Sequence, residues 1–197
     1  MDATEGRLVV EDDGSSTVRI VRLIPAPRER VWAALTEPER LEPWIGTYTG
    51  DPASGRVSFR MTAEGEDVAA SDWEISACEP RSLLALATAV GEQRWRLELR
   101  LDDQHGATLL CLRQPGIDPT AAGDVGPGWE YYLDRLAASV TGGDVAAVDF
   151  ERDYYPARSE RDRPPGAKPA AACAAYRIRG RRGGRTRPAT RRWRRAR

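Results

Sequence analysis

The side chains that most often carry chemistry are few in this sequence and lie far apart along it. There is one histidine, His105, and there are three cysteines, Cys78, Cys111 and Cys173. His105 lies in the stretch 102–106, whose Asp and Gly residues are typical of a hairpin turn, so we expect a solvated turn residue. A serine–histidine triad would have to use this one histidine. The odd number and wide spacing of the cysteines favour free thiols in a cytoplasmic protein over a disulfide framework.

The short motifs that mark phosphate loops, dinucleotide sites and zinc proteases do not occur in the sequence. No pair of carboxylates has a spacing that by itself indicates acid–base catalysis. We therefore name no catalytic residue, no metal ligand and no cofactor, and a binding function is favoured over an enzymatic one. Arg94, Arg96 and Arg100 share the polar face of one predicted strand. They form a solvated face if the sheet is convex there, or a site for an anionic head group if it is concave.

Apolar side chains, several of them aromatic, recur on one face of several predicted strands and helices. Ordinary core packing produces this pattern, and so does the apolar wall of a small-molecule pocket. Tryptophan is common near ligands because it offers a large apolar area and an N–H group. We predict a pocket for a small hydrophobic or amphipathic ligand, lined by Trp44, Phe59, Met61, Trp73, Leu86, Trp95, Leu97, Leu99, Trp129 and Tyr132.

The elements that would position this pocket follow from hydrophobic periodicity. Residues 94–101 alternate most regularly, with apolar and charged side chains on opposite faces, which predicts a half-buried strand. Residues 128–141 place apolar side chains at helical spacing and precede two glycines, which predicts a helix that ends there. The loop 115–127 before this helix is rich in Gly, Pro and Asp. Further strands are predicted at 17–24, 56–61, 72–77, 82–90 and 107–113, and two short helices at 27–35 and from residue 36 to before Pro43.

This order of elements predicts an α+β fold. A curved antiparallel sheet of about six to seven strands would wrap around the long C-terminal helix, with the two short helices after the first strand. We expect a flexible N-terminus at 1–15, a domain at 16–143, an extension at 144–161 and a disordered tail at 162–197.

Three segments together resemble a known family: residues 19–41, the sequence Pro-Trp-Ile-Gly at 43–46, and residues 128–136. They are similar to the bacterial homologues of the heat-shock-protein-90 ATPase activator, within the START-like (SRPBCC) superfamily. The resemblance covers roughly residues 15–156. It implies a helix-grip fold, as in START and Bet v-like proteins, with an apolar ligand pocket between the sheet and the long C-terminal helix. It also implies three further possibilities: a chaperone as partner, a link to the stress response, and, in a few members, cyclase or dehydratase activity.

Charge is distributed very unevenly along the chain. Residues 1–156 contain 15 arginines and 28 acidic residues, a net charge of −13, and residues 157–197 carry +13. The basic tail lacks the large apolar residues needed to fold. It is interpreted as a neutral tail or frameshift product, as a solvated electrostatic tail that binds the acidic body, or as a nucleic-acid-binding segment in which Trp193 stacks on bases. The sequence has no secretory signal and no run of apolar residues that would span a membrane, so we expect a cytoplasmic protein.

Overall fold

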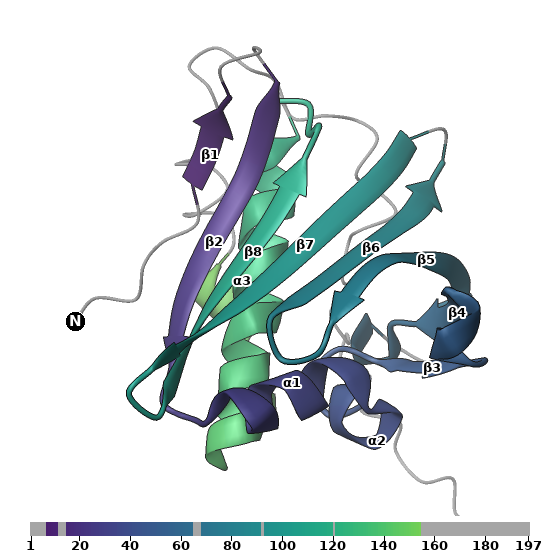
Figure 1. Cartoon of the computed structure of the whole chain (residues 1–197). Coiled ribbons are helices and arrows are strands. Elements are labelled where there is room, and N and C mark those ends of the chain that lie inside the picture. Colours follow the sequence, from purple (N-terminus) through teal and green to yellow (C-terminus); the bar gives the residue numbers. More distant parts are fainter. Residues whose placement is uncertain (1–6, 12–14, 65–67, 92, 120, 155–197) are drawn as a thin grey trace, which may run out of the picture.

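A single curved antiparallel sheet and one long helix dominate the computed structural model, which describes residues 7–11, 15–64, 68–91, 93–119 and 121–154 (Figure 1). Eight strands pair in the order β1-β2-β8-β7-β6-β5-β4-β3. The expected α+β class, curved sheet and long C-terminal helix are therefore confirmed. The elements are β1 (Arg7–Val10), β2 (Ser16–Ile24), α1 (Arg28–Thr36), α2 (Pro38–Leu41), β3 (Thr47–Thr49), η1 (Pro52–Ser54), β4 (Arg56–Arg60), η2 (Thr62–Glu64), β5 (Ser71–Glu79), β6 (Leu83–Val90), β7 (Gln93–Gln104), β8 (Ala107–Pro115), α3 (Ala122–Thr141), η3 (Val145–Ala147) and α4 (Phe150–Asp153).

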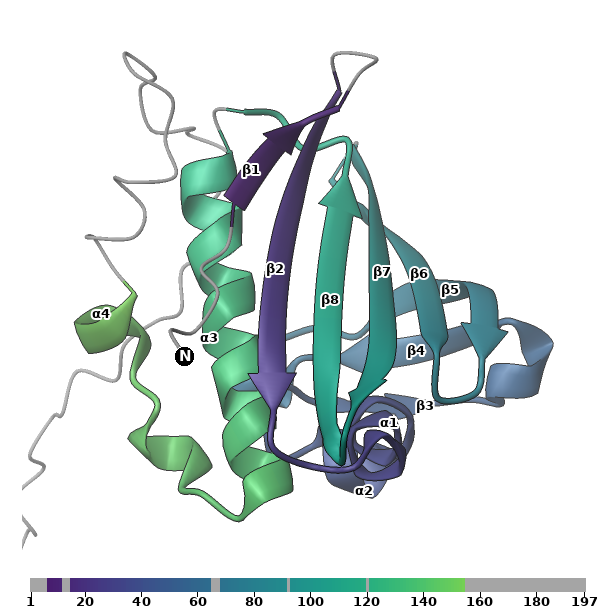
Figure 2. The ribbon, with the colours of Figure 1, turned by 60° about the vertical axis from the view of Figure 1, so that its left-hand side comes forward.

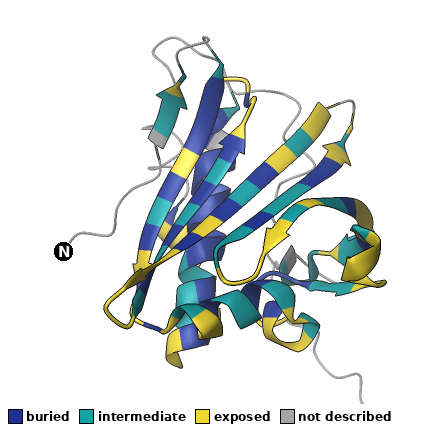
Figure 3. Ribbon diagram, viewed as in Figure 1, coloured by how far each residue is buried: buried dark blue, intermediate teal, exposed yellow. Residues whose placement is uncertain are grey.

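Burial follows the alternation of side chains along the central strands (Figure 3). On β7, Leu97, Leu99 and Leu101 are buried, while Arg96 and Arg100 are exposed. Leu99 pairs with Leu112 of β8, so the apolar faces of the two strands coincide. This face turns toward α3, and the charged face of β7 is the solvated one. The arginines of β7 therefore lie on the convex side of the sheet.

Helix α3 begins six residues earlier than the pattern predicts, at Ala122 instead of Gly128, and it contains Pro127. The prediction of a loop over all of 115–127 is wrong for its second half. Proline and glycine disfavour helix, but tertiary packing overrides weak local preferences. Ala122, Val125 and Pro127 are all buried in this first part of the helix. The helix ends at Gly142, whose φ of 79° is the left-handed conformation that glycine adopts readily at a helix C-terminus.

The sheet is larger than the pattern indicates at both of its edges. Arg7–Val10, within the N-terminus that was expected to be flexible, pairs with β2 as strand β1. Thr47–Thr49 pairs with β4 as β3. Both strands are too short to show a clear alternation of apolar and polar residues, which explains why the sequence pattern misses them. Strand β7 also continues to Gln104, so the hairpin turn is tighter than expected and consists of His105 and Gly106.

After α3 the chain folds back along the helix. In Figure 2 the segment that carries η3 and α4 lies on the side of α3 away from the sheet. The rest of the predicted extension, and the whole predicted tail at 162–197, lie outside the described residues. Among the described residues, no helix combines the length and apolar character needed to cross a bilayer.

Candidate functional site

An apolar cavity of about 180 Å³ lies between the sheet, the two short helices and α3. Eight of the ten residues predicted from the sequence line it: Trp44, Phe59, Met61, Trp73, Leu86, Leu97, Leu99 and Trp129. Trp95 lies instead on a second, more polar cleft. Tyr132 is buried in the core beside Tyr131, with ring centroids 5.0 Å apart, and is not on the cavity wall.

Twelve further residues complete the wall, and half of them come from the stretch between α1 and η1, for which the sequence predicts only Trp44 as a lining residue. Helices α1 and α2 and the chain up to η1 close one end. The other missed residues lie on the inner faces of β4, β5, β6 and β8 and on α3, beside residues that had been predicted. Their apolar character was visible in the sequence, but their proximity depends on tertiary packing. They are Leu35, Thr36, Leu41, Ile45, Tyr48, Pro52, Val57, Ile75, Cys78, Leu84, Leu112 and Leu133.

The three tryptophans with indole rings on the cavity wall donate their N–H groups to the protein. Trp44 Nε1 donates to the carbonyl oxygen of Ala34 at 2.9 Å. Trp73 Nε1 donates to Ser71 Oγ at 3.0 Å. Trp129 Nε1 donates to Gln114 Oε1 at 2.5 Å. Since an indole has only this one donor, all three rings present apolar surface to the cavity.

The two hydroxyl groups of the wall are also engaged with the backbone. Tyr48 donates to the carbonyl oxygen of Thr36 at 2.8 Å, and Thr36 Oγ1 donates to that of Trp32 at 2.9 Å. Burial raises the pKa of the Tyr48 phenol above its ordinary value, and the negative charges of Glu39 and Glu37 raise it further. Tyr48 is therefore a neutral phenol near pH 7. Among the described residues, those that line the cavity include no Asp, Glu, Lys, Arg or His.

The exposure of the lining residues distinguishes the floor of the cavity from its mouth. Leu97, Leu99 and Leu112 are buried and form part of the floor. Cys78 and Pro52 belong to the same wall but are exposed to solvent. Cys78 therefore marks the mouth. Cys111 lies on β8 between the inward-facing Leu110 and Leu112, so its side chain is on the opposite face of the sheet.

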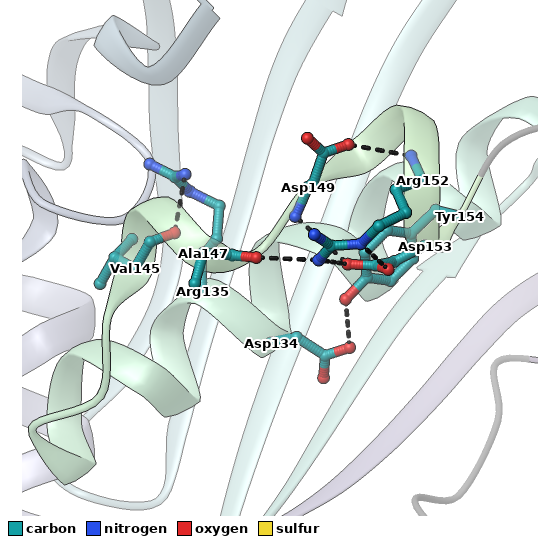
Figure 4. A network of polar contacts seen from close by, with 8 residues as sticks. All are labelled: Asp134, Arg135, Val145, Ala147, Asp149, Arg152, Asp153 and Tyr154. Carbon is teal, nitrogen blue, oxygen red and sulfur yellow. Dashed lines mark hydrogen bonds and ion pairs between the residues drawn. The ribbon is translucent and has the colours of Figure 1, made fainter.

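Arg135 of α3 holds the segment that carries Trp44 in place. Its Nε atom donates to the carbonyl oxygen of Trp44 at 2.8 Å, and a terminal nitrogen donates to that of Pro43 at 3.3 Å. The other terminal nitrogen donates to the carbonyl oxygen of Val145 at 3.3 Å (Figure 4). One guanidinium group thus joins the cavity wall, the long helix and the C-terminal extension.

The extension is attached to α3 by a second polar contact one residue away. The Tyr154 hydroxyl donates to Asp134 Oδ2 at 2.6 Å (Figure 4). The other oxygen of Asp134 accepts from Arg22 Nε at 2.7 Å, and the Arg22 side chain is buried on the inner face of β2. Tyr131 packs edge-on against Tyr154 and Phe150. These contacts attach α4 and Tyr154 to α3.

Of the histidine and the two cysteines in the described part of the chain, only Cys78 lies on the cavity wall. His105 is exposed at the turn between β7 and β8, as the sequence predicts. Within the described part of the chain, no three His, Cys, Asp or Glu side chains gather closely enough to hold a metal ion. The basic tail proposed as a nucleic-acid-binding segment lies outside the described residues.

Comparisons with known proteins agree with this geometry. Residues 25–141 match the family described as "Activator of Hsp90 ATPase homolog 1-like protein". The chain is similar to CalU16 from Micromonospora echinospora, with 25% identity over 82% of this chain and 94% of that one, at a TM-score of 0.61. It is also similar to the protein MLL2253 from Mesorhizobium loti, with 27% identity over 65% of this chain and 98% of that one, at a TM-score of 0.57. No curated protein matches it.

Proposed function

Since the chain belongs to the family of Activator of Hsp90 ATPase homolog 1-like proteins, and its sheet and long helix enclose an apolar cavity, we propose that it binds a compact hydrophobic molecule there. The ligand is either apolar throughout or amphipathic with its apolar part in the cavity. The observation that carries the proposal is the wall itself, with three indole rings whose N–H groups all donate to the protein.

Size and polarity together define the ligand class. The volume of about 180 Å³ is near that of a dry apolar cavity of roughly 150 Å³ that admits benzene. It is below the roughly 300–1,000 Å³ of drug-sized sites. A polar atom placed against this wall would lose its hydration and meet donors that are already used. The part of the ligand inside the cavity is therefore small and has few polar atoms.

The same wall favours binding over catalysis. Cyclase and dehydratase chemistry moves protons, and a general acid or base must reach the reacting atoms. Within the described part of the chain, the lining residues provide one neutral phenol, one threonine hydroxyl and one thiol, with no carboxylate, imidazole or amine. Stimulation of a chaperone ATPase remains the alternative that the family description implies, and no feature of the described surface favours it over ligand binding.

Calorimetric titration of the full chain with 2-ethylnaphthalene tests the proposal. We expect one site per chain and a negative heat-capacity change, the mark of apolar burial. The matched control is naphthalene-2-sulfonate, which has the same rings and a fixed negative charge. It should bind more weakly, because a charge that enters the cavity finds no partner among the described lining residues. Absence of binding by the hydrocarbon would refute the proposed function.

A further inference from the structure

A second hollow, which we call the polar cleft, lies where β7 begins and β8 ends. Its volume is about 590 Å³, and its wall includes Ser16, Gln93, Arg94, Trp95, Gln114 and Asp118. Trp95 is the predicted ligand-binding tryptophan that the apolar cavity leaves out. The wall of this cleft combines polar side chains with one aromatic ring, whereas the wall of the cavity is mostly apolar.

Gln114, in the wall of the cleft, has the feature that indicates a ligand site. Its side-chain oxygen accepts from Trp129 Nε1 at 2.5 Å. Because the indole nitrogen is a donor only, this bond fixes which end of the amide is oxygen. The amide nitrogen, Nε2, then has no hydrogen-bond partner among the described residues. Gln114 is only 1% exposed, so bulk solvent does not reach this donor, and buried donors without a protein partner are rare in native proteins.

The Gln114–Trp129 hydrogen bond joins the two hollows. Trp129 belongs to the wall of the apolar cavity, and Gln114 belongs to the wall of the polar cleft. The unpartnered donor therefore lies within one amide group of the indole that a ligand in the cavity would contact.

We propose that the polar cleft receives the polar end of an amphipathic ligand, and that the Gln114 amide N–H donates to a carbonyl-type oxygen there. This inference rests on the proposed function, because the apolar part of the same molecule occupies the cavity. Since Nε2 is buried and the Gln114–Trp129 pair lies between the two hollows, binding requires these two side chains to move and open a passage from the cavity to the cleft.

The charges around the cleft favour a neutral acceptor over an anion. Arg94 lies on the wall, but its guanidinium is paired with Glu74 at 2.6 Å. Asp118 adds a negative charge to the same wall. A carboxylate or phosphate would therefore meet no excess of positive charge. A ketone, an ester or an amide carbonyl fits these surroundings.

A matched pair of probes separates this contact from hydrophobic binding. 2-Acetylnaphthalene and 2-ethylnaphthalene have the same skeleton and differ in one carbonyl oxygen. Both are titrated calorimetrically into the full chain, into Gln114→Met and into Thr17→Val. The control Thr17→Val removes another buried oxygen without a partner among the described residues, on the opposite face of the sheet. The measured quantity is the dissociation constant of the ethyl compound divided by that of the acetyl compound.

We expect this ratio to fall about tenfold in Gln114→Met, the typical effect of losing one buried hydrogen bond, and to stay unchanged in Thr17→Val. An unchanged ratio in Gln114→Met, with both probes still bound, would overturn this inference and leave the proposed function standing. Failure of both probes to bind the unaltered chain would overturn the proposed function and this inference together.

Discussion

Filling the apolar cavity should stabilise the protein and abolish ligand binding at the same time. Leu86 is half-buried on β6 and lies on the cavity wall. Leu86→Trp places an indole in the hollow. Stabilising substitutions impair function mainly where they alter the functional site, so a variant that gains stability and loses binding identifies the hollow as the ligand site.

The magnitude follows from the cavity volume. At about 24 cal/mol per Å³, the value for a closed cavity, a space of about 180 Å³ sets an upper bound of roughly 4 kcal/mol. Replacing leucine with tryptophan adds about a third of that volume, so it recovers about 1 kcal/mol where the ring fits without strain. For a chain of this size the midpoint of thermal unfolding rises by about 2–4 °C.

Two assays measure the outcome: denaturant unfolding, and titration with 2-ethylnaphthalene. Leu23→Trp is the matched control, because Leu23 is 49% exposed on the outer face of β2. It should change neither stability nor binding. A loss of more than about 2 kcal/mol in Leu86→Trp, the range expected for overpacking, together with retained probe binding, would refute the reasoning.

Three further substitutions test the packing that shapes the site. Gly46→Ala should lower the free energy of unfolding by about 2–3 kcal/mol in denaturant titrations, because a Cβ there would collide with the Arg60 carbonyl oxygen; unaltered stability would contradict the close approach of these two segments. Tyr48→Phe should reduce the pH dependence of stability above the ordinary phenol pKa of 10.0. Burial, followed by Glu39 and Glu37, raises the folded-state pKa, so the Tyr48 contribution is complete below that pH and is lost as the pH rises. Urea unfolding from pH 9 to 11 measures this, and an equal slope in both proteins would argue against it. Thr17→Val should leave stability unchanged or raise it by up to about 1 kcal/mol, since it removes a buried hydroxyl that has no partner among the described residues; a clear loss in thermal unfolding would show that the hydroxyl is paired.

The sequence predicts the parts of this fold that repeat a pattern over several residues. The alternation along β7 identifies Leu97 and Leu99 as inward-facing, and both line the cavity. The start of α3 is not predicted, because the glycines and Pro127 of its first turns disfavour helix locally and are retained by burial.

The positions of Trp95 and Gln114 at the polar cleft could not be predicted from the sequence, because they depend on tertiary structure. Trp95 has the same alternation as Leu97, yet it lies on the polar cleft at the far end of the strand. Gln114 is an unremarkable residue at the end of a strand, and its role depends on Trp129, 15 positions away. Periodicity reports which face of an element is buried, but it does not report which buried residues border a hollow.

Protection of Cys78 tests most directly whether a ligand occupies the apolar cavity. Cys78 is exposed at the mouth, and Cys111 on the opposite face of the sheet serves as the internal control. Alkylation of the full chain by N-ethylmaleimide is followed peptide by peptide in a mass spectrometer, with and without 2-ethylnaphthalene. We predict that the hydrocarbon slows the labelling of Cys78 in proportion to its calorimetric occupancy and leaves Cys111 unaffected. Unchanged labelling of Cys78 at saturating probe would contradict binding in this cavity.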